Sequence, residues 1–393
     1  MTNASSSSAS GLKIFLQNKL AVAGLCLIVL ILIPAVAGYL VTPDATPQAN
    51  EMLVQLSLKK PGTAFTMLRL KKEEQTIKVG FFQQMFYGQP AAYRNIPVTS
   101  FRFKADSIYV REYIGDEDIS AENAFNIYKI SGKKSIASAK NKKTVLKEAF
   151  VLSLRNDIIN HQIFKKTFWL GTDIYGRDLL SRLIIGARIS LAVGFASVII
   201  SLLVGVSIGA VAGYYGGKTD AVLSWLMNVL WALPSLLLVI AISFALGKGL
   251  WQIFVAVGLS MWVEVGRLVR GQVIALKQVE FIEAARALGY KDFRIIVHHI
   301  LPNITGPILV LAASNFASAI LLEAGLSFLG YGAQPPTPTW GAMIKEHYGY
   351  IVMDSAYLAV LPGLAIMLIV YAFNMVTIGL KDAFEVKAQN SRF

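Results

Sequence analysis

The feature that most constrains this chain is a series of nearly uncharged apolar runs, each about as long as a bilayer is thick. A transmembrane helix needs about 20 consecutive apolar residues. The chain is 55% hydrophobic and only 16% charged, which is too apolar for one soluble core. We therefore predict an all-α polytopic membrane protein with six transmembrane helices. The predicted spans are 20–41, 189–214, 220–246, 250–267, 303–331 and 356–380.

Residues 42–166, between the first two predicted spans, are polar and rich in charge. Alternating runs at 99–104 and 107–111 predict strands, and residues 120–150 predict helix. The lysine-rich run 133–143 predicts a solvated surface. We expect an inserted extracytoplasmic α+β domain. Two interpretations of its role stay open, contact with a binding protein and an insertion that is merely tolerated.

The distribution of Lys and Arg predicts the orientation, because short cytoplasmic loops carry an excess of basic residues. With the N-terminus inside, the short outside loops hold only Lys248 and Lys345. The inside segments then hold Lys13, Lys19, Lys218, Arg267, Arg270, Lys277, Arg286, Lys291, Arg294, Lys381, Lys387 and Arg392. Both termini are therefore expected in the cytoplasm. The predicted organisation is a cytoplasmic tail (1–19), a first transmembrane helix (20–41), the insertion (42–166), a core domain with five spans (167–385) and a second cytoplasmic tail (386–393).

A charged segment, Glu283 to Pro302, interrupts the apolar runs and reads EAARALGYKDFRIIVHHILP. An apolar stripe at helical spacing precedes and enters it. Gly289 is well suited to end this helix in the left-handed conformation, and Pro302 is tolerated where a new helix begins. Ala284 and Ala285 lack bulk, which would let another surface approach the backbone. The stripe consists of Val279, Ile282, Ala285 and Leu288.

This pattern of Glu-Ala-Ala, three residues, Gly, and Leu-Pro twelve positions later resembles the EAA loop of ABC-importer permeases. In that family the loop forms a coupling helix that docks into a cytoplasmic ATPase. One departure is His299, which stands where the family usually has isoleucine. The resemblance implies ATPase coupling by Glu283, Ala284, Ala285, Gly289, Leu301 and Pro302.

Two further segments are similar to the dipeptide, oligopeptide and nickel branch of these permeases, and to its C-type subunit. One is GTDIYGRDLLSRLIIGARISL, from Gly171, and the other is LSFLG followed by QPPTPTWGAM, within 325–351. The first also predicts an amphipathic helix along the membrane surface. Its polar side would consist of Asp173, Arg177, Asp178, Arg182 and Arg188, with the Asp and Arg residues pairing locally.

The resemblance implies a non-enzymatic permease subunit of an ATP-driven importer, with di- or oligopeptides as the expected cargo. It would form half of the translocation pathway in a multi-pass protein of the cell (inner) membrane. The implied partners are a second permease in a heterodimer, one or two ABC ATPases and an extracytoplasmic peptide-binding protein. Import of nickel or another small solute is the alternative within this class. A membrane-anchored sensor with an extracytoplasmic ligand domain is the alternative from a different class.

No catalytic constellation, cofactor site or metal site is predicted. The sequence has no GxxxxGK[ST] phosphate loop, so ATP is expected on partner subunits. His298 and His299 are adjacent and would point in different directions. The net charge of +13 comes without an aromatic-basic recognition motif, so no nucleic acid is expected.

Ionisable and polar residues inside predicted spans are the remaining functional candidates. Glu323 and Asn315, both in the fifth span, are possible pathway residues. Glu264 and Arg267 lie one helical turn apart, and we expect them to form a structural pair.

Overall fold

The computed structural model describes residues 12–72, 79–115, 122–131, 144–247 and 249–390, with backbone alone at 144–148 and 385–390. The lysine-rich run 133–143 lies outside these residues. The chain folds as two compact units. Unit 1 comprises residues 1–36, 186–351 and 356–393, and unit 2 comprises residues 37–185 and 352–355.

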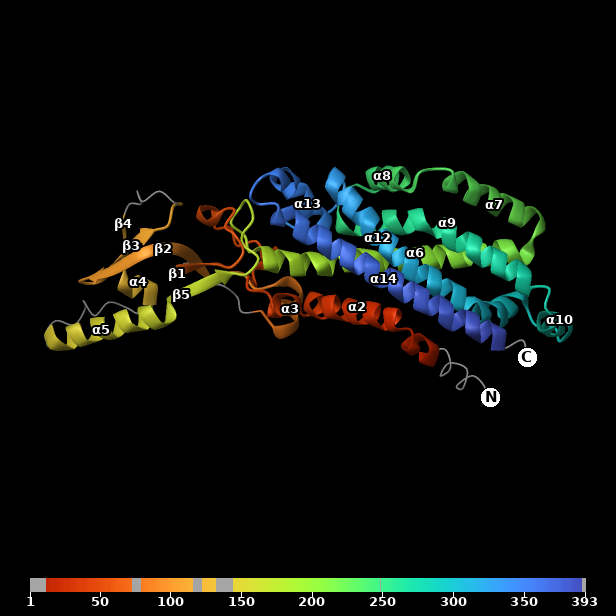
Figure 1. Cartoon of the computed structure of the whole chain (residues 1–393), viewed down its shortest axis with the longest axis horizontal. Coiled ribbons are helices and arrows are strands. Elements are labelled where there is room, and N and C mark those ends of the chain that lie inside the picture. The colour runs from red at the N-terminus through yellow and green to blue at the C-terminus, as the bar shows by residue number, and fades with distance from the viewer. Residues whose placement is uncertain (1–11, 73–78, 116–121, 132–143, 248, 391–393) are drawn as a thin grey trace. The chain divides into compact units, whose positions relative to one another are not determined.

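Among the described residues, five helical segments are long and apolar enough to cross a membrane (Figure 1). The α-helices that form them are α2 (Lys19–Ala37), α6 (Leu179–Tyr215), α9 (Leu250–Leu276), α12 (Thr305–Leu329) and α14 (Tyr357–Asn390). The predicted span 220–246 is instead a bent pair, α7 (Gly217–Trp231) and α8 (Ser235–Leu246), whose axes differ by 98°. Pro234 explains the break, because proline has no N–H and disfavours helix at the residue before it. The pair makes a sixth span only if both helices are counted together.

Glycines bring the long helices of unit 1 into close contact. A Cβ added at Gly209 of α6 would lie 2.4 Å from the carbonyl oxygen of Gly266 on α9. Gly205 and Gly213, one turn to either side, approach the α9 backbone in the same way. Such small residues at every fourth position are typical of helix packing in membranes.

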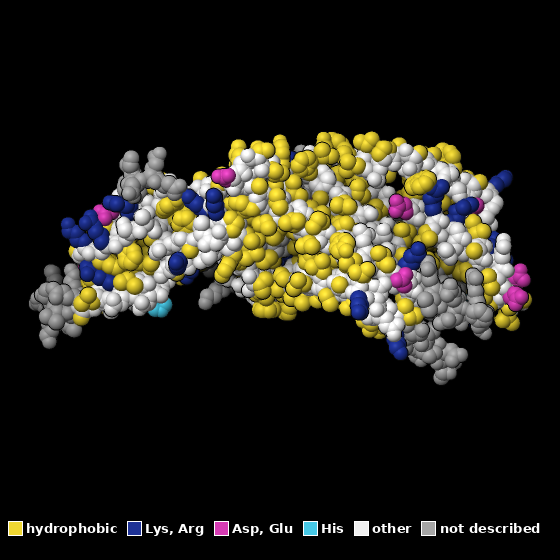
Figure 2. All heavy atoms as spheres, viewed as in Figure 1, with side chains coloured by type: hydrophobic (Ala, Val, Ile, Leu, Met, Phe, Trp, Pro, Cys, Tyr) yellow, Lys and Arg dark blue, Asp and Glu magenta, His cyan; other side chains and the backbone are white. Residues whose placement is uncertain are grey.

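The outside of unit 1 is apolar, as expected for a surface that faces lipid. Figure 2 shows hydrophobic side chains over most of the visible face of this unit, with charged ones gathered toward the end that carries α10 (Glu280–Ala287). Exposed large apolar side chains of unit 1 include Leu30, Ile33, Phe195, Leu203, Trp225, Leu237, Phe244 and Met367.

Unit 2 contains an antiparallel five-stranded sheet in the order β4-β3-β2-β1-β5 (Figure 1). Thr66 of β1, which lies between β2 and β5, pairs with Val98 of β2 and Lys165 of β5. Buried apolar residues of β3 and α5, such as Ile108 and Leu154, form its main core. The elements are β1 (Thr63–Lys71), α3 (Phe81–Tyr87), β2 (Tyr93–Lys104), β3 (Ser107–Glu112), β4 (Glu122–Asn126), α4 (Ile127–Ser131), α5 (Thr144–His161) and β5 (Ile163–Phe168).

The predicted strand runs 99–104 and 107–111 lie in β2 and β3. The helix predicted from residue 120 is wrong at Glu122–Asn126, which forms β4 and pairs along β3. Helix resumes in α4 and α5. The pairing partner, which is distant from local sequence signals, decides the conformation of β4.

The amphipathic surface helix predicted for the segment that begins at Gly171 is also wrong. Its first part is a loop, because Gly171 and Gly176 adopt left-handed φ values of +81° and +72°, and α6 begins only at Leu179. Asp173 and Arg177 are buried in unit 2, and they form the predicted local ion pair. The alternation of charges therefore reflects an internal ion pair and not a solvated helix face.

Candidate functional site

The short helix α10 carries the Glu-Ala-Ala motif at one end of unit 1 (Figure 1). Its first turn holds Glu280 and Glu283, and its last turn holds Arg286, which matches the charges of the helix dipole. The helix ends in a Schellman motif. The Gly289 N–H donates to the Arg286 carbonyl at 2.9 Å, and the Tyr290 N–H donates to the Ala285 carbonyl at 3.1 Å. Gly289 has a φ of +77°, which confirms the predicted left-handed end.

One face of α10 packs on unit 1 and the opposite face is open. Ile282 and Ala285 are buried in a cluster with residues of α9 and of 295–304. Glu283 and Ala284 are exposed, and Leu288 is 73% exposed. The predicted apolar stripe is therefore only half buried, since Val279 and Leu288 face outward. Of the two alanines expected to leave room for another surface, Ala284 faces outward and Ala285 packs inside its own chain.

Polar contacts fix this loop to the end of α6. The Tyr214 hydroxyl donates to the Asp292 carboxylate at 2.8 Å. The Arg286 guanidinium lies 5.3 Å from the centre of the Tyr214 ring, and Lys277 donates to the Tyr214 carbonyl. The sequence analysis missed Tyr214 because no local signal links it to a loop about 70 residues later. These contacts attach the segment that carries α10 to the end of α6.

The chain leaves the loop through a helical path that starts earlier than predicted. Helix begins at Asp292 and continues as a π-helical segment, Ile295–Ile300, and a 3-10 turn, Leu301–Ile304, into α12. Pro302 lies inside this path and does not start it. Because proline has no N–H, it cannot make the regular helical bond to residue 298, which explains the irregular turns. Leu301 packs against the same cluster as Ile282 and Ala285.

The two predicted pathway residues lie inside unit 1. Glu323 is fully buried and accepts hydrogen bonds from Ser190 of α6 at 3.0 Å and Ser327 of α12 at 2.7 Å. The hydroxyl of Thr339, which caps the short helix α13 (Trp340–His347), donates to the Ser327 hydroxyl at 3.3 Å. Asn315 is 2% exposed. Glu323 thus joins α12 to α6 through the Ser190 hydroxyl, and Ser327 connects it to the start of α13.

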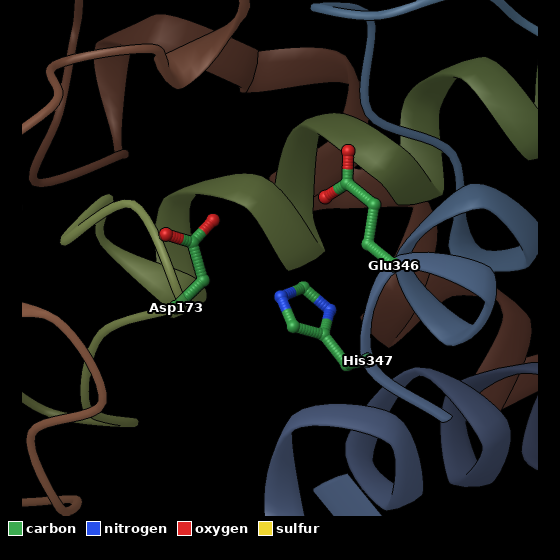
Figure 3. A group of neighbouring side chains, drawn as sticks. All are labelled: Asp173, Glu346 and His347. Atoms are coloured by element: carbon green, nitrogen blue, oxygen red, sulfur yellow. The ribbon is translucent and has the colours of Figure 1, made fainter. Parts of the chain in front are cut away.

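Figure 3 shows Glu346 and His347 at the end of α13, together with Asp173. The His347 Nδ1 lies 2.7 Å from the Met343 carbonyl oxygen. Asp173 belongs to unit 2, where it pairs with Arg177. We infer no metal site from these three residues.

A bundle of membrane-length helices with a short charged helix at one end places this protein in the class of polytopic membrane components. The model of the family "binding-protein-dependent transport system inner membrane component" matches residues 205–389. A model of the N-terminal transmembrane domain of oligopeptide transport permease C matches residues 9–61.

Named relatives agree with these matches. The chain is 45% identical over 222 residues to a dipeptide transport system permease protein of Alkalihalophilus pseudofirmus, covering 56% of this chain and 73% of the relative. It is 42% identical over 222 residues to a glutathione transport system permease protein of Pectobacterium atrosepticum, with the same coverage. The chain therefore belongs to the peptide and nickel family of ABC-importer permeases, and it is a permease subunit. The predicted resemblance is confirmed.

A solved structure of the MetNI methionine ABC transporter in inward-facing form is also similar. It is 21% identical, with a TM-score of 0.41, and the match covers 51% of this chain and 97% of that chain.

Proposed function

We propose that this permease imports di- or oligopeptides, as half of a pathway completed by a second, different permease. The support comes from the relatives, which are named as dipeptide and glutathione transport permeases. An extracytoplasmic peptide-binding protein would deliver the cargo. One or two cytoplasmic ABC ATPases would bind and hydrolyse ATP, so this subunit needs no cofactor of its own.

The observation that carries the proposed mechanism is the way in which α10 is attached to unit 1. Its inner face is anchored by Ile282 and Ala285, while Glu283, Ala284 and Leu288 are exposed. A helix held this way can transmit a force from a docked ATPase into the bundle. Gly289 would set its end, and Leu301 and Pro302 would connect it to α12.

The proposed topology has six spans, with the bent pair α7 and α8 as the third. Both termini and α10 would face the cytoplasm, which agrees with the excess of Lys and Arg in the short segments on that side. Residues 42–166 would form an extracytoplasmic α+β domain. Glu323 and Asn315 are proposed pathway residues. Because both are buried, they would act by holding the helices around the pathway in place.

Affinity purification of the tagged chain from its native membrane, followed by mass spectrometry, tests the partners. We expect an ABC ATPase and a second permease in the eluate. Reproducible recovery of the chain alone in mild detergent would contradict the proposal.

Two substitutions test the role of α10 in the same assay. Ala284→Arg places a bulky charge on the exposed face, and Gly289→Pro imposes a negative φ where the chain needs +77°. Each is expected to lower ATPase recovery by about tenfold or more, which corresponds to about 1.4 kcal/mol of docking free energy. Ala221→Arg is the matched control, because Ala221 is an exposed alanine on α7. Normal ATPase recovery with Ala284→Arg would rule out docking through this face.

A further inference from the structure

An acidic side chain lies exposed near the middle of α9. Glu264 is on the surface of unit 1, and among the described residues it forms no ion pair. The predicted pair with Arg267 is wrong, because the Arg267 guanidinium lies 4.0 Å from the centre of the Trp231 ring and donates to Asn228 at 3.3 Å. A charge inside a span faces protein or water and not lipid. Glu264 therefore needs a polar neighbour, and the described part of the chain offers no ion-pair partner for it.

The bend of the third span leaves Glu264 uncovered. After the bend, α8 covers the first half of α9, where Val239 packs against Ile253 and Met261. Before the bend, α7 packs on another side of α9, through Met227 and Trp262. Glu264 comes after the half of α9 that packs on α8. It also lies on a different side of α9 from Trp262, which packs on α7. A straight third span would not separate the two contacts in this way.

The same face of α9 continues into an open groove. The groove has a volume of about 750 Å³ and is lined by Leu268 and Gln272 of α9. Positions 264, 268 and 272 are successive turns of one helix face. On α12 the groove is lined by Ser314, and Ser318, one turn further, is exposed. Glu264 and Ser318 are exposed one helical turn beyond the lining of the groove, on α9 and α12 respectively.

We propose that Glu264 lines the translocation pathway and binds the positively charged amino end of the cargo. A carboxylate only accepts hydrogen bonds, and an ammonium group is its natural partner. A peptide carries such a group at its amino end, so this assignment rests on the proposed peptide cargo. A basic residue of the second permease is the competing partner, and the experiments below distinguish it.

The first experiment tests the location without any cargo. The only cysteine, Cys26, is replaced by serine, and Glu264→Cys is added to the complete complex in inside-out membrane vesicles. A water-soluble, impermeant maleimide is expected to label this variant and to lose access when a nonhydrolysable nucleotide closes the ATPases. Two controls in the same background are Val265→Cys, at a buried position, and Leu30→Cys, at an apolar position 68% exposed. Both should stay unlabelled. Failure of the Glu264→Cys variant to react in the open complex would overturn the pathway location.

The second experiment tests the recognition. Glu264→Gln removes the charge, and uptake of a tripeptide with a free amino end is expected to fall by about tenfold, the loss of one charge-assisted contact. Glu264→Asp should retain most of the uptake, and Glu122→Gln, on an exposed strand of unit 2, should retain all of it. An equal loss for the N-acetylated tripeptide would overturn recognition of the amino end.

The competing outcome is also measurable. If Glu264→Gln releases the second permease during purification, Glu264 is an interface residue and the proposal is wrong. If the unaltered complex takes up no peptide, the proposed cargo fails and its amino end is excluded as the partner. The labelling result still decides whether Glu264 lies in a water-filled pathway.

Discussion

The two units of this chain differ in the surface that they present. Both bury large apolar side chains, but unit 1 also exposes many of them, such as Phe195 and Leu203, and brings its helices into close contact through glycines, such as Gly209 against Gly266. In unit 2 large apolar residues such as Ile108 and Leu154 are fully buried. Unit 2 has the pattern of a domain driven by removal of apolar surface from water. Between helices in lipid that force is absent, so close backbone packing takes its place.

The comparison also separates what is shared with relatives from what is not. The two family matches cover residues 9–61 and 205–389, so most of unit 2 lies outside both. Unit 1 contains most of the larger family match, together with α10 and the groove of the proposals above. Unit 2 has its own sheet and core. A substitution in the packing of unit 1 is therefore expected to affect the whole helix bundle, and one in the core of unit 2 is expected to affect the sheet alone.

The largest effect is expected from Gly209→Val. Its side chain would collide with the backbone of α9, which cannot move without displacing the whole helix. We expect loss of most folded protein, measured as the yield of monodisperse complex in detergent.

Gly271→Val is the matched control for this prediction. A Cβ at Gly271 would meet nothing within 4 Å, although it lies on the same helix bundle. Its yield should stay near that of the unaltered chain. Equal yields for both variants would show that close packing of α6 on α9 does not hold unit 1 together.

A smaller and more local effect is expected from Ile108→Ala. This side chain is fully buried in the sheet core, and its truncation should cost about 2–5 kcal/mol of the local stability of unit 2. Amide hydrogen exchange should rise in β2 and β3 and stay unchanged in α9 and α12. Ile114→Ala, at a position 59% exposed, is the control. A rise throughout unit 1 would contradict the independence of the two units.

The membrane-length helices were predictable because a bilayer demands long apolar runs, and that demand is written locally in the sequence. The end of α10 was predictable for the same reason, since Gly289 is a local signal. The bend of the third span also had a local cause in Pro234, but its angle depends on how α7 and α8 pack on α9.

Features that depend on partners far along the chain were not predictable. The strand conformation of Glu122–Asn126 follows from its pairing with β3. The charges of Asp173 and Arg177 predicted a helix on the membrane surface, but the two residues form a buried ion pair. Charge alone does not tell whether such a pair lies inside the protein or on its surface. The exposure of Glu264 depends on where the contact between α8 and α9 ends, which no local sequence pattern indicates. In each case a contact with residues elsewhere in the chain decides the structure, and the local sequence pattern does not indicate it.

The smallest effect is expected at the surface of unit 2, from Glu122→Gln. Arg102 donates to the Glu122 carboxylate at 2.7 Å, and this hydrogen bond holds the pKa of Glu122 below its usual value. Any stabilisation is therefore present at neutral pH and is lost as the pH falls through that lowered pKa.

Because the pair is exposed to solvent, water and salt screen it, and such pairs contribute little to stability. Hydrogen exchange of β2 and β4 should be indistinguishable between Glu122→Gln and the unaltered chain at neutral pH. An increase as large as that of Ile108→Ala would mean that surface charge, and not the apolar core, holds this sheet together. Removal of apolar surface from water would then not be the main source of stability in unit 2.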